Sequence, residues 1–267
     1  MNGSSYQISV AKQINAVAAI FASCGVKLLI PITTGFDGGN FPVGTNTPAQ
    51  YAAMCAWLVE QCPGLYWEIL NEPDYSGTTP AVYTEVVQAA YPAMKVADPT
   101  CMVIAGVLSD IFSGGQTYWS TCYADGIKGY YDAISIHTYT NNGGQIYGPG
   151  YDPGNDLLPY LVEFKNILVS NGDASTPLWI TEFGWDTNSF SLWQQATYTY
   201  LWFSEIQNQG IDVAICYKLI DDPGDGDGIV LDTYLPKPAW YAMRGLVTGV
   251  QQPHFVKNGN VRARLNL

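Results

Sequence analysis

The hydrophobic pattern alternates between two kinds of segment along the chain. Short apolar runs, typical of buried parallel strands, occupy 26–32, 65–70, 102–107, 132–139, 178–181 and 213–219. Segments with apolar residues at helical spacing occupy 9–24, 47–61, 80–96, part of 117–128, 157–170, 192–209 and 238–247. Six strand-then-helix repeats of this kind predict a parallel sheet. At 267 residues they favour a TIM-type α/β barrel over a doubly wound sheet.

The chain shows one composition regime and no linker, so we expect a single domain over 1–267. Near its end, residues 254–265 alternate around Asn258-Gly259, which predicts a β-hairpin. The stretches 33–44 and 141–155 are rich in glycine and asparagine. We expect the first to be a loop at the site face and the second to be a substrate-contact loop.

Two of the predicted strands end in a glutamate. Trp67–Asp74 reads WEILNEPD and delivers Glu72, and 178–185 reads LWITEFGW and delivers Glu182. In a barrel of this class, side chains at the C-terminal ends of strands face the active site. A pair of carboxyls is what glycosidic-bond hydrolysis needs, one to protonate the leaving oxygen and one to attack or to activate water. The alternative for each is a solvated glutamate at a strand end.

Composition narrows the choice of ligand. A net charge of -12 with only 11 Lys and Arg argues against nucleic acid or an anionic membrane as partner, and favours a neutral ligand. The 19 tyrosines and 8 tryptophans suit the apolar faces of sugars, although most are expected in the core. Phosphate-binding glycine motifs are missing, which disfavours a cofactor-dependent oxidoreductase.

Targeting signals are weak. The sequence has no apolar run long enough for a transmembrane helix, and Met1–Ser5 is too short and polar for a signal peptide. A composition high in Gly, Thr and Asn and low in charge leans toward an extracellular enzyme, without deciding the compartment.

The six cysteines form no CxxC pair, which argues against a zinc site. We expect Cys24 and Cys216 to be core residues, whereas Cys55 with Cys62, or Cys101 with Cys122, could form disulfides in an oxidising compartment.

The acidic turn 221–228 (DDPGDGDG) lacks the final glutamate of a calcium-binding EF-hand loop. We therefore expect a solvated loop over the site, and neither a metal nor a cofactor.

Four motifs follow one another along the chain: NEP at the end of a strand, SIHTY, WITEFGW and YKLIDDPGDGDG. Together they resemble the clan A glycoside hydrolases, nearest to the family 39 group of β-xylosidases and β-glycosidases, over 10–250. The resemblance implies a (β/α)8 barrel with Glu72 as acid/base after strand four and Glu182 as nucleophile after strand seven. It also implies a cofactor-free retaining enzyme acting on β-glucosides or β-xylosides.

The same resemblance implies the roles of five further residues. Asn71 would bond the sugar 2-hydroxyl, and Tyr139 would donate a hydrogen bond to the nucleophile. His137 would line the pocket, with a core histidine as the alternative. Trp185 and Tyr217 would form aromatic walls, although Trp185 is equally suited to packing.

The chain departs from that family in two ways. Where many relatives carry a tryptophan on strand eight, Cys216 stands here. Only the strand at 26–32 precedes Glu72, so strands one and two are absent unless 6–10 supplies a remnant. Two open edges follow, and we expect another protomer or the hairpin 254–265 to cover them. The alternative function is a non-catalytic carbohydrate-binding or scaffold protein derived from a truncated barrel.

Overall fold

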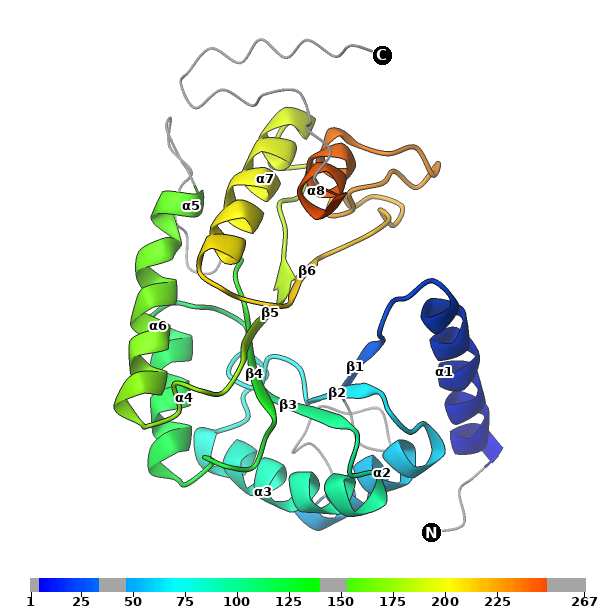
Figure 1. Cartoon of the computed structure of the whole chain (residues 1–267), viewed down its shortest axis with the longest axis vertical. Coiled ribbons are helices and arrows are strands. Elements are labelled where there is room, and N and C mark those ends of the chain that lie inside the picture. The colour runs from blue at the N-terminus through cyan, green and yellow to red at the C-terminus, as the bar shows by residue number, and fades with distance from the viewer. Residues whose placement is uncertain (1–4, 34–46, 140–152, 249–267) are drawn as a thin grey trace. The chain divides into compact units, whose positions relative to one another are not determined.

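The computed structural model describes residues 5–33, 47–139 and 153–248. Its six strands form a sheet in the order β1 to β6. The pairs β1–β2, β2–β3, β3–β4 and β5–β6 are parallel. The strands are β1 (Leu29–Ile32), β2 (Tyr66–Ile69), β3 (Met102–Leu108), β4 (Ala133–His137), β5 (Leu178–Phe183) and β6 (Ala214–Cys216). The helices are α1 (Ser5–Ser23), α2 (Pro48–Gln61), α3 (Pro80–Ala97), α4 (Ser113–Ala124), α5 (Pro153–Asp156), α6 (Leu158–Ser170), α7 (Leu192–Asn208) and α8 (Pro238–Thr248) (Figure 1).

Each strand is followed by a helix, which confirms the predicted alternation. The topology is that of a TIM-type barrel with six βα units in place of eight. Most element bounds agree with the sequence pattern to within a few residues. The exception is α4, which begins at Ser113 because the Asp110 carboxylate accepts hydrogen bonds from the Phe112 and Gly115 amides there.

The N-terminal region does not supply the strand remnant that the sequence left open. Residues 6–10 belong to α1. Within the described residues, β1 is therefore the one strand that precedes β2. Helix α1 contacts the end of α2, where the Asn15 side chain donates a hydrogen bond of 2.8 Å to the Gln61 carbonyl.

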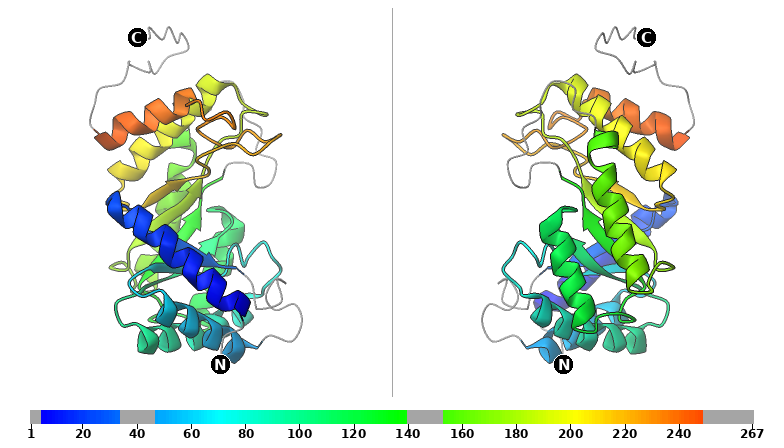
Figure 2. Two further views of the ribbon diagram at one scale, coloured as in Figure 1. Left: turned by 90° about the vertical axis from the view of Figure 1, so that its right-hand side faces the viewer. Right: turned by 90° about the vertical axis from the view of Figure 1, so that its left-hand side faces the viewer.

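By contacts the chain divides into two compact units. The first unit comprises Met1–Ile136 with Ile167–Pro177, and the second comprises His137–Asn166 with Leu178–Leu267. Helices α2 and α3 of the first unit lie side by side, as do α7 and α8 of the second (Figures 1 and 2).

Local signals explain where two of these helices begin. Thr47 caps α2 and Ser191 caps α7, each in a reciprocal capping box with the glutamine three residues later. In the first unit the apolar faces of α2 and α3 bury large residues such as Met54 and Met94. The second unit has its own core, in which Ala196 of α7 packs with Ile229, Val230 and Ala239.

The cysteines differ in part from expectation. All six are free thiols, so neither of the two disulfides that the sequence permits is present in this structure. Cys55, Cys62, Cys101 and Cys122 are buried, whereas Cys24 is exposed and Cys216 is half-buried. The prediction of a core position was wrong for Cys24, because it follows the last turn of α1 at the surface.

Three expectations concern residues outside the described part of the chain: the hairpin 254–265, most of the loops at 33–44 and 141–155, and the terminal residues 1–4. None of the described helices is both long and apolar enough to cross a bilayer.

Candidate active site

Glu72 lies just beyond the C-terminal end of β2, in the first unit. Its backbone adopts φ = 46°, in the left-handed region that non-glycine residues seldom occupy. Its amide donates a hydrogen bond of 2.9 Å to the Val107 carbonyl at the end of β3. Asn71 precedes it, and both residues are half-buried. The strand-end position predicted for Asn71 and Glu72 is therefore observed.

Two buried tyrosines hold the strand ends on which Glu72 depends. The Tyr51 hydroxyl donates to the Ile32 carbonyl at 2.7 Å and accepts from the Leu70 amide at 3.2 Å. The Tyr83 hydroxyl donates to the Ile69 carbonyl and accepts from the Gly106 amide at 2.8 Å. Burial raises the pKa of both phenols well above the ordinary value, so both remain protonated donors.

These tyrosines allow the chain to leave the regular ladder. Leu70 lies at φ = 64°, and the pairing of β3 with β4 shifts between Gly106 and Leu108. At such an irregularity the backbone groups lose their ladder partners, and the hydroxyls replace them. Sequence periodicity did not reveal this function of Tyr51 and Tyr83, because the partners are 14 to 23 residues away.

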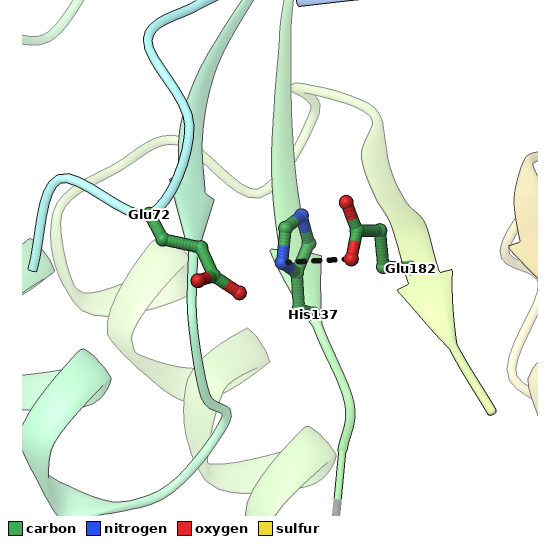
Figure 3. Close-up of side chains that lie close together, drawn as sticks. All are labelled: Glu72, His137 and Glu182. Atoms are coloured by element: carbon green, nitrogen blue, oxygen red, sulfur yellow. Dashed lines mark ion pairs between the residues drawn. The ribbon is translucent and has the colours of Figure 1, made fainter. Parts of the chain in front are cut away.

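Glu182 occupies β5, in the second unit, and is partly exposed. The Tyr139 hydroxyl donates a hydrogen bond of 2.8 Å to its Oε2. Nδ1 of the buried His137 lies 3.7 Å from the same oxygen (Figure 3). The amide of Thr138 donates to the Glu182 carbonyl at 3.0 Å, which joins the end of β4 to β5. The structure thus brings together three of the predicted site residues.

These contacts orient the carboxyl of Glu182. Tyr139 donates to Oε2 and His137 lies beside the same oxygen, so the side chain has a defined position. A carboxyl held in this way at a strand end suits nucleophilic attack on a substrate.

The two predicted aromatic walls have different surroundings. Trp185 is 2% exposed, and its ring packs against Phe183 and Tyr198 at centroid distances of 6.2 and 5.9 Å. Trp185 is therefore a packing residue, which was the alternative to an aromatic wall. Tyr217 follows β6, is 41% exposed, and lies edge-on to Tyr139 at 6.4 Å.

Gly184 permits the close approach of two chain segments beside these residues. A Cβ atom there would collide with the Tyr217 carbonyl. The Tyr217 amide also donates to the Phe183 carbonyl at 2.8 Å. The glycine in WITEFGW is therefore required sterically, because the Tyr217 backbone leaves no room for a side chain at position 184.

The acidic turn is more ordered than the predicted solvated loop. Lys237, only 1% exposed at its side chain, lies 2.8 Å from the Asp221 carboxylate and also donates to the Gly226 carbonyl. Lys218 pairs with both Asp222 and Asp225. Asp221, Asp222 and Asp225 therefore have cationic partners. Within the described ranges, this turn does not assemble three metal-ligand atoms.

The partner of Asp221 was missed in the sequence. Lys237 stands 16 positions further on, and no short motif links the two residues. A lysine before a predicted helix gave no sign of burial.

No protein-family model matches the sequence, and no curated protein matches it either. Solved structures do share its fold. A family 39 glycoside hydrolase from the gut symbiont Bacteroides cellulosilyticus WH2 superposes with a TM-score of 0.68 at 22% identity, over 84% of this chain and 51% of that one. A glucosidase from Croceicoccus marinus gives a TM-score of 0.63 at 20% identity, over 86% of this chain and 52% of that one. A family 39 β-xylosidase from Caulobacter crescentus gives a TM-score of 0.60 at 17% identity, over 88% of this chain and 57% of that one.

These similarities show the fold, which is that of a TIM-type (β/α) barrel. The chain spans about half the length of the first two solved structures, 51% and 52%.

Proposed function

We propose that the protein is a retaining glycoside hydrolase that cleaves β-glucosides or β-xylosides, with Glu182 as nucleophile and Glu72 as acid/base. The observation that carries the proposal is the hydrogen bond from Tyr139 to Glu182, because it prepares a strand-end carboxylate for attack. The carbohydrate class is supported by the fold, since its solved relatives are glycoside hydrolases.

The proposal requires Glu72 and Glu182 to face one sugar from opposite sides. Glu72 follows β2 and Glu182 lies near the end of β5, and the C-terminal ends of parallel strands share one edge of a sheet. A retaining mechanism needs carboxyl groups about 5 Å apart. The meeting of these two carboxyls stays a prediction, and the experiments below test it.

In the first step, Glu182 attacks the anomeric carbon while Glu72 gives its proton to the departing glycosidic oxygen. The C–O bond to the leaving group breaks, and an ester to Glu182 forms. In the second step, Glu72 takes a proton from water, the water oxygen bonds to the anomeric carbon, and Glu182 leaves as a carboxylate. Configuration is retained because the carbon is inverted twice.

The other residues have supporting roles in this proposal. Asn71 bonds the 2-hydroxyl, an interaction that strengthens in the transition state. His137 holds Glu182 in place from within the fold, and the exposed ring of Tyr217 offers a wall to the sugar. Because the packed Trp185 has almost no accessible surface, it does not serve as a second wall.

The mechanism needs no metal. Glu72, His137 and Glu182 are residues of kinds that can ligate metals, yet each already has a proton-transfer or charge role here. Treatment with a chelator should leave hydrolysis unchanged.

The decisive experiment screens a panel of nitrophenyl glycosides and then replaces each glutamate. Glu72→Gln and Glu182→Gln should each reduce hydrolysis at least about a hundred-fold, whereas the exposed Glu85→Gln serves as a matched control. Azide should rescue Glu182→Gly and give a glycosyl azide of inverted configuration. Full activity of both Gln variants would refute the assignment.

A non-catalytic carbohydrate-binding or scaffold protein is the second candidate. It is favoured by the sheet of the described residues, which has six strands where a complete barrel has eight. It predicts that calorimetry detects binding of a sugar that the protein does not hydrolyse. It also predicts that Glu72→Gln leaves that binding within about two-fold.

We further propose that a second copy of the chain covers the edge strands β1 and β6. Each has one paired neighbour in the sheet order. Helix α1 also exposes apolar side chains, including Ile20 at 65% and Phe21 at 41%. Light scattering should then give a mass of two chains, and Ile20→Asp should lower it to one.

A further inference from the structure

Asp74 joins the loop that carries Glu72 to the loop after β3. Its carboxylate accepts hydrogen bonds from the Ser109 amide at 2.9 Å and from the Ser109 hydroxyl at 2.8 Å. Ser109 is buried. All these residues belong to the first unit. A carboxylate held by two donors of one residue has a single well-defined position.

A second bond joins the same two loops. The Glu72 amide donates to the Val107 carbonyl, and both residues have φ = 46°. Neither residue is a glycine, so each is held in a backbone conformation that it would not adopt alone. Such conformations persist only when the surrounding contacts determine them. The bonds of Asp74 to Ser109, two residues beyond each strained position, are the adjacent contacts that do so.

The turn that follows Glu72 transmits this constraint. The amides of Tyr75 and Ser76 both donate to the Glu72 carbonyl, at 3.1 and 2.9 Å. The Thr78 amide donates to the Pro73 carbonyl at 3.2 Å. Because Asp74 lies inside this hydrogen-bonded turn, a shift of its carboxylate moves the backbone on which the Glu72 side chain stands.

Burial makes the ionised form of Asp74 unfavourable. It raises the pKa of this carboxyl, and the nearby Asp110 acts in the same direction, while the bonds from Ser109 oppose the shift. The hydrogen bonds that Ser109 donates offset part of the solvation that the Asp74 carboxyl loses on burial, and they join the two loops.

We propose that Asp74 is a positioning residue, which through Ser109 aims the Glu72 carboxyl at the leaving-group oxygen. The inference rests on the proposed function, in which Glu72 is the acid/base. Asp74 itself contacts neither substrate nor the reacting atoms.

The test exploits the fact that leaving groups differ in their need for an acid. A phenyl glycoside requires protonation by Glu72, whereas a 2,4-dinitrophenyl glycoside departs without it. The measured quantity is kcat/KM, which reports the glycosylation step for both substrates. Asp74→Asn should lower kcat/KM at least about ten-fold on the phenyl glycoside and less than about three-fold on the dinitrophenyl glycoside.

Two further variants make the result specific. Ser109→Ala removes the hydroxyl bond alone and should change the two substrates in the same unequal way, by a smaller factor. Asp98→Asn is the matched control, because Asp98 is also buried and accepts bonds from the Gly64 amide at 2.7 Å and the Thr100 hydroxyl at 2.6 Å, before β3. It should affect both substrates equally.

An equal loss on both glycosides in Asp74→Asn would overturn the positioning role and leave a merely structural one. Unchanged kcat/KM on both would also overturn it. If the wild-type enzyme hydrolyses glycosides but Glu72→Gln does so equally well, the proposed function fails first and the inference falls with it. The two failures are therefore distinguishable.

Discussion

The hydroxyl of Tyr139 donates a hydrogen bond of 2.8 Å to Oε2 of Glu182. Because a bond to a charged acceptor contributes about 1.5–3 kcal/mol, Tyr139→Phe should lower kcat/KM about 10- to 100-fold on aryl glycosides. Steady-state kinetics measures the loss. Tyr130 is an exposed tyrosine before β4, so Tyr130→Phe is the control and should leave the rate unchanged. A wild-type rate in Tyr139→Phe would contradict the role given to this bond.

Gly184→Ala should destabilise the second unit. The new Cβ would collide with the Tyr217 carbonyl, so the ends of β5 and β6 must move apart. We expect a loss of about 1–3 kcal/mol in the free energy of unfolding, measured by urea titration. Gly114→Ala is the matched control: its Cβ would meet only the Asp110 side chain at an ordinary 3.4 Å. Equal stabilities for the two variants would refute the steric explanation.

Lys237→Met should leave the Asp221 carboxylate buried without its cation. Removing one partner of a buried pair costs about 3–5 kcal/mol, and urea titration should show a loss of this order. Lys218→Met provides the contrast, since Lys218 pairs with Asp222 and Asp225 at the surface, where water screens the charges and such pairs contribute far less stability. If Lys237→Met is no less stable than Lys218→Met, Asp221 does not depend on that lysine.

The thiols should differ sharply in reactivity. Burial raises the pKa of Cys101 to about 11 and that of Cys122 to about 12, so neither forms much thiolate at about pH 8. Cys24 is exposed and should react alone among these three when the native protein is treated with iodoacetamide. Peptide mass mapping locates the label, and denaturant should make the buried thiols reactive. Rapid native labelling of Cys122 would contradict its burial.

The stability contributed by Asp74 should depend on pH in a defined direction. Burial raises its pKa in the folded state above the ordinary 3.8, so the folded protein binds this proton more tightly than the unfolded chain. Its contribution is fully present below pH 3.8 and is lost as the pH rises through the folded-state pKa. The free energy of unfolding of wild type minus that of Asp74→Asn should therefore decrease over this interval. Denaturant titrations at several pH values measure it, and an increase would contradict the sign.

Much of the fold was predictable because its signals are local. Apolar periodicity located the strands and helices, and the caps at Thr47 and Ser191 need only residues a few positions away. Glu72 and Glu182 were located in the same way, since each follows an apolar run within its own segment. These features depend on the order of neighbours along the chain, and they determined the alternating architecture and the candidate carboxylates.

The tertiary structure decided features that depend on contacts between distant residues. Trp185 is packed in the core because α7 places Tyr198 against its ring. Lys237 can be buried because the Asp221 carboxylate, from an earlier turn, pairs with it. Asp74 acquired a partner 35 positions away, in Ser109. The burial of a side chain, the pairing of charges and the strain of the backbone arise only when distant segments meet in space. The sequence pattern of a single segment therefore does not predict them.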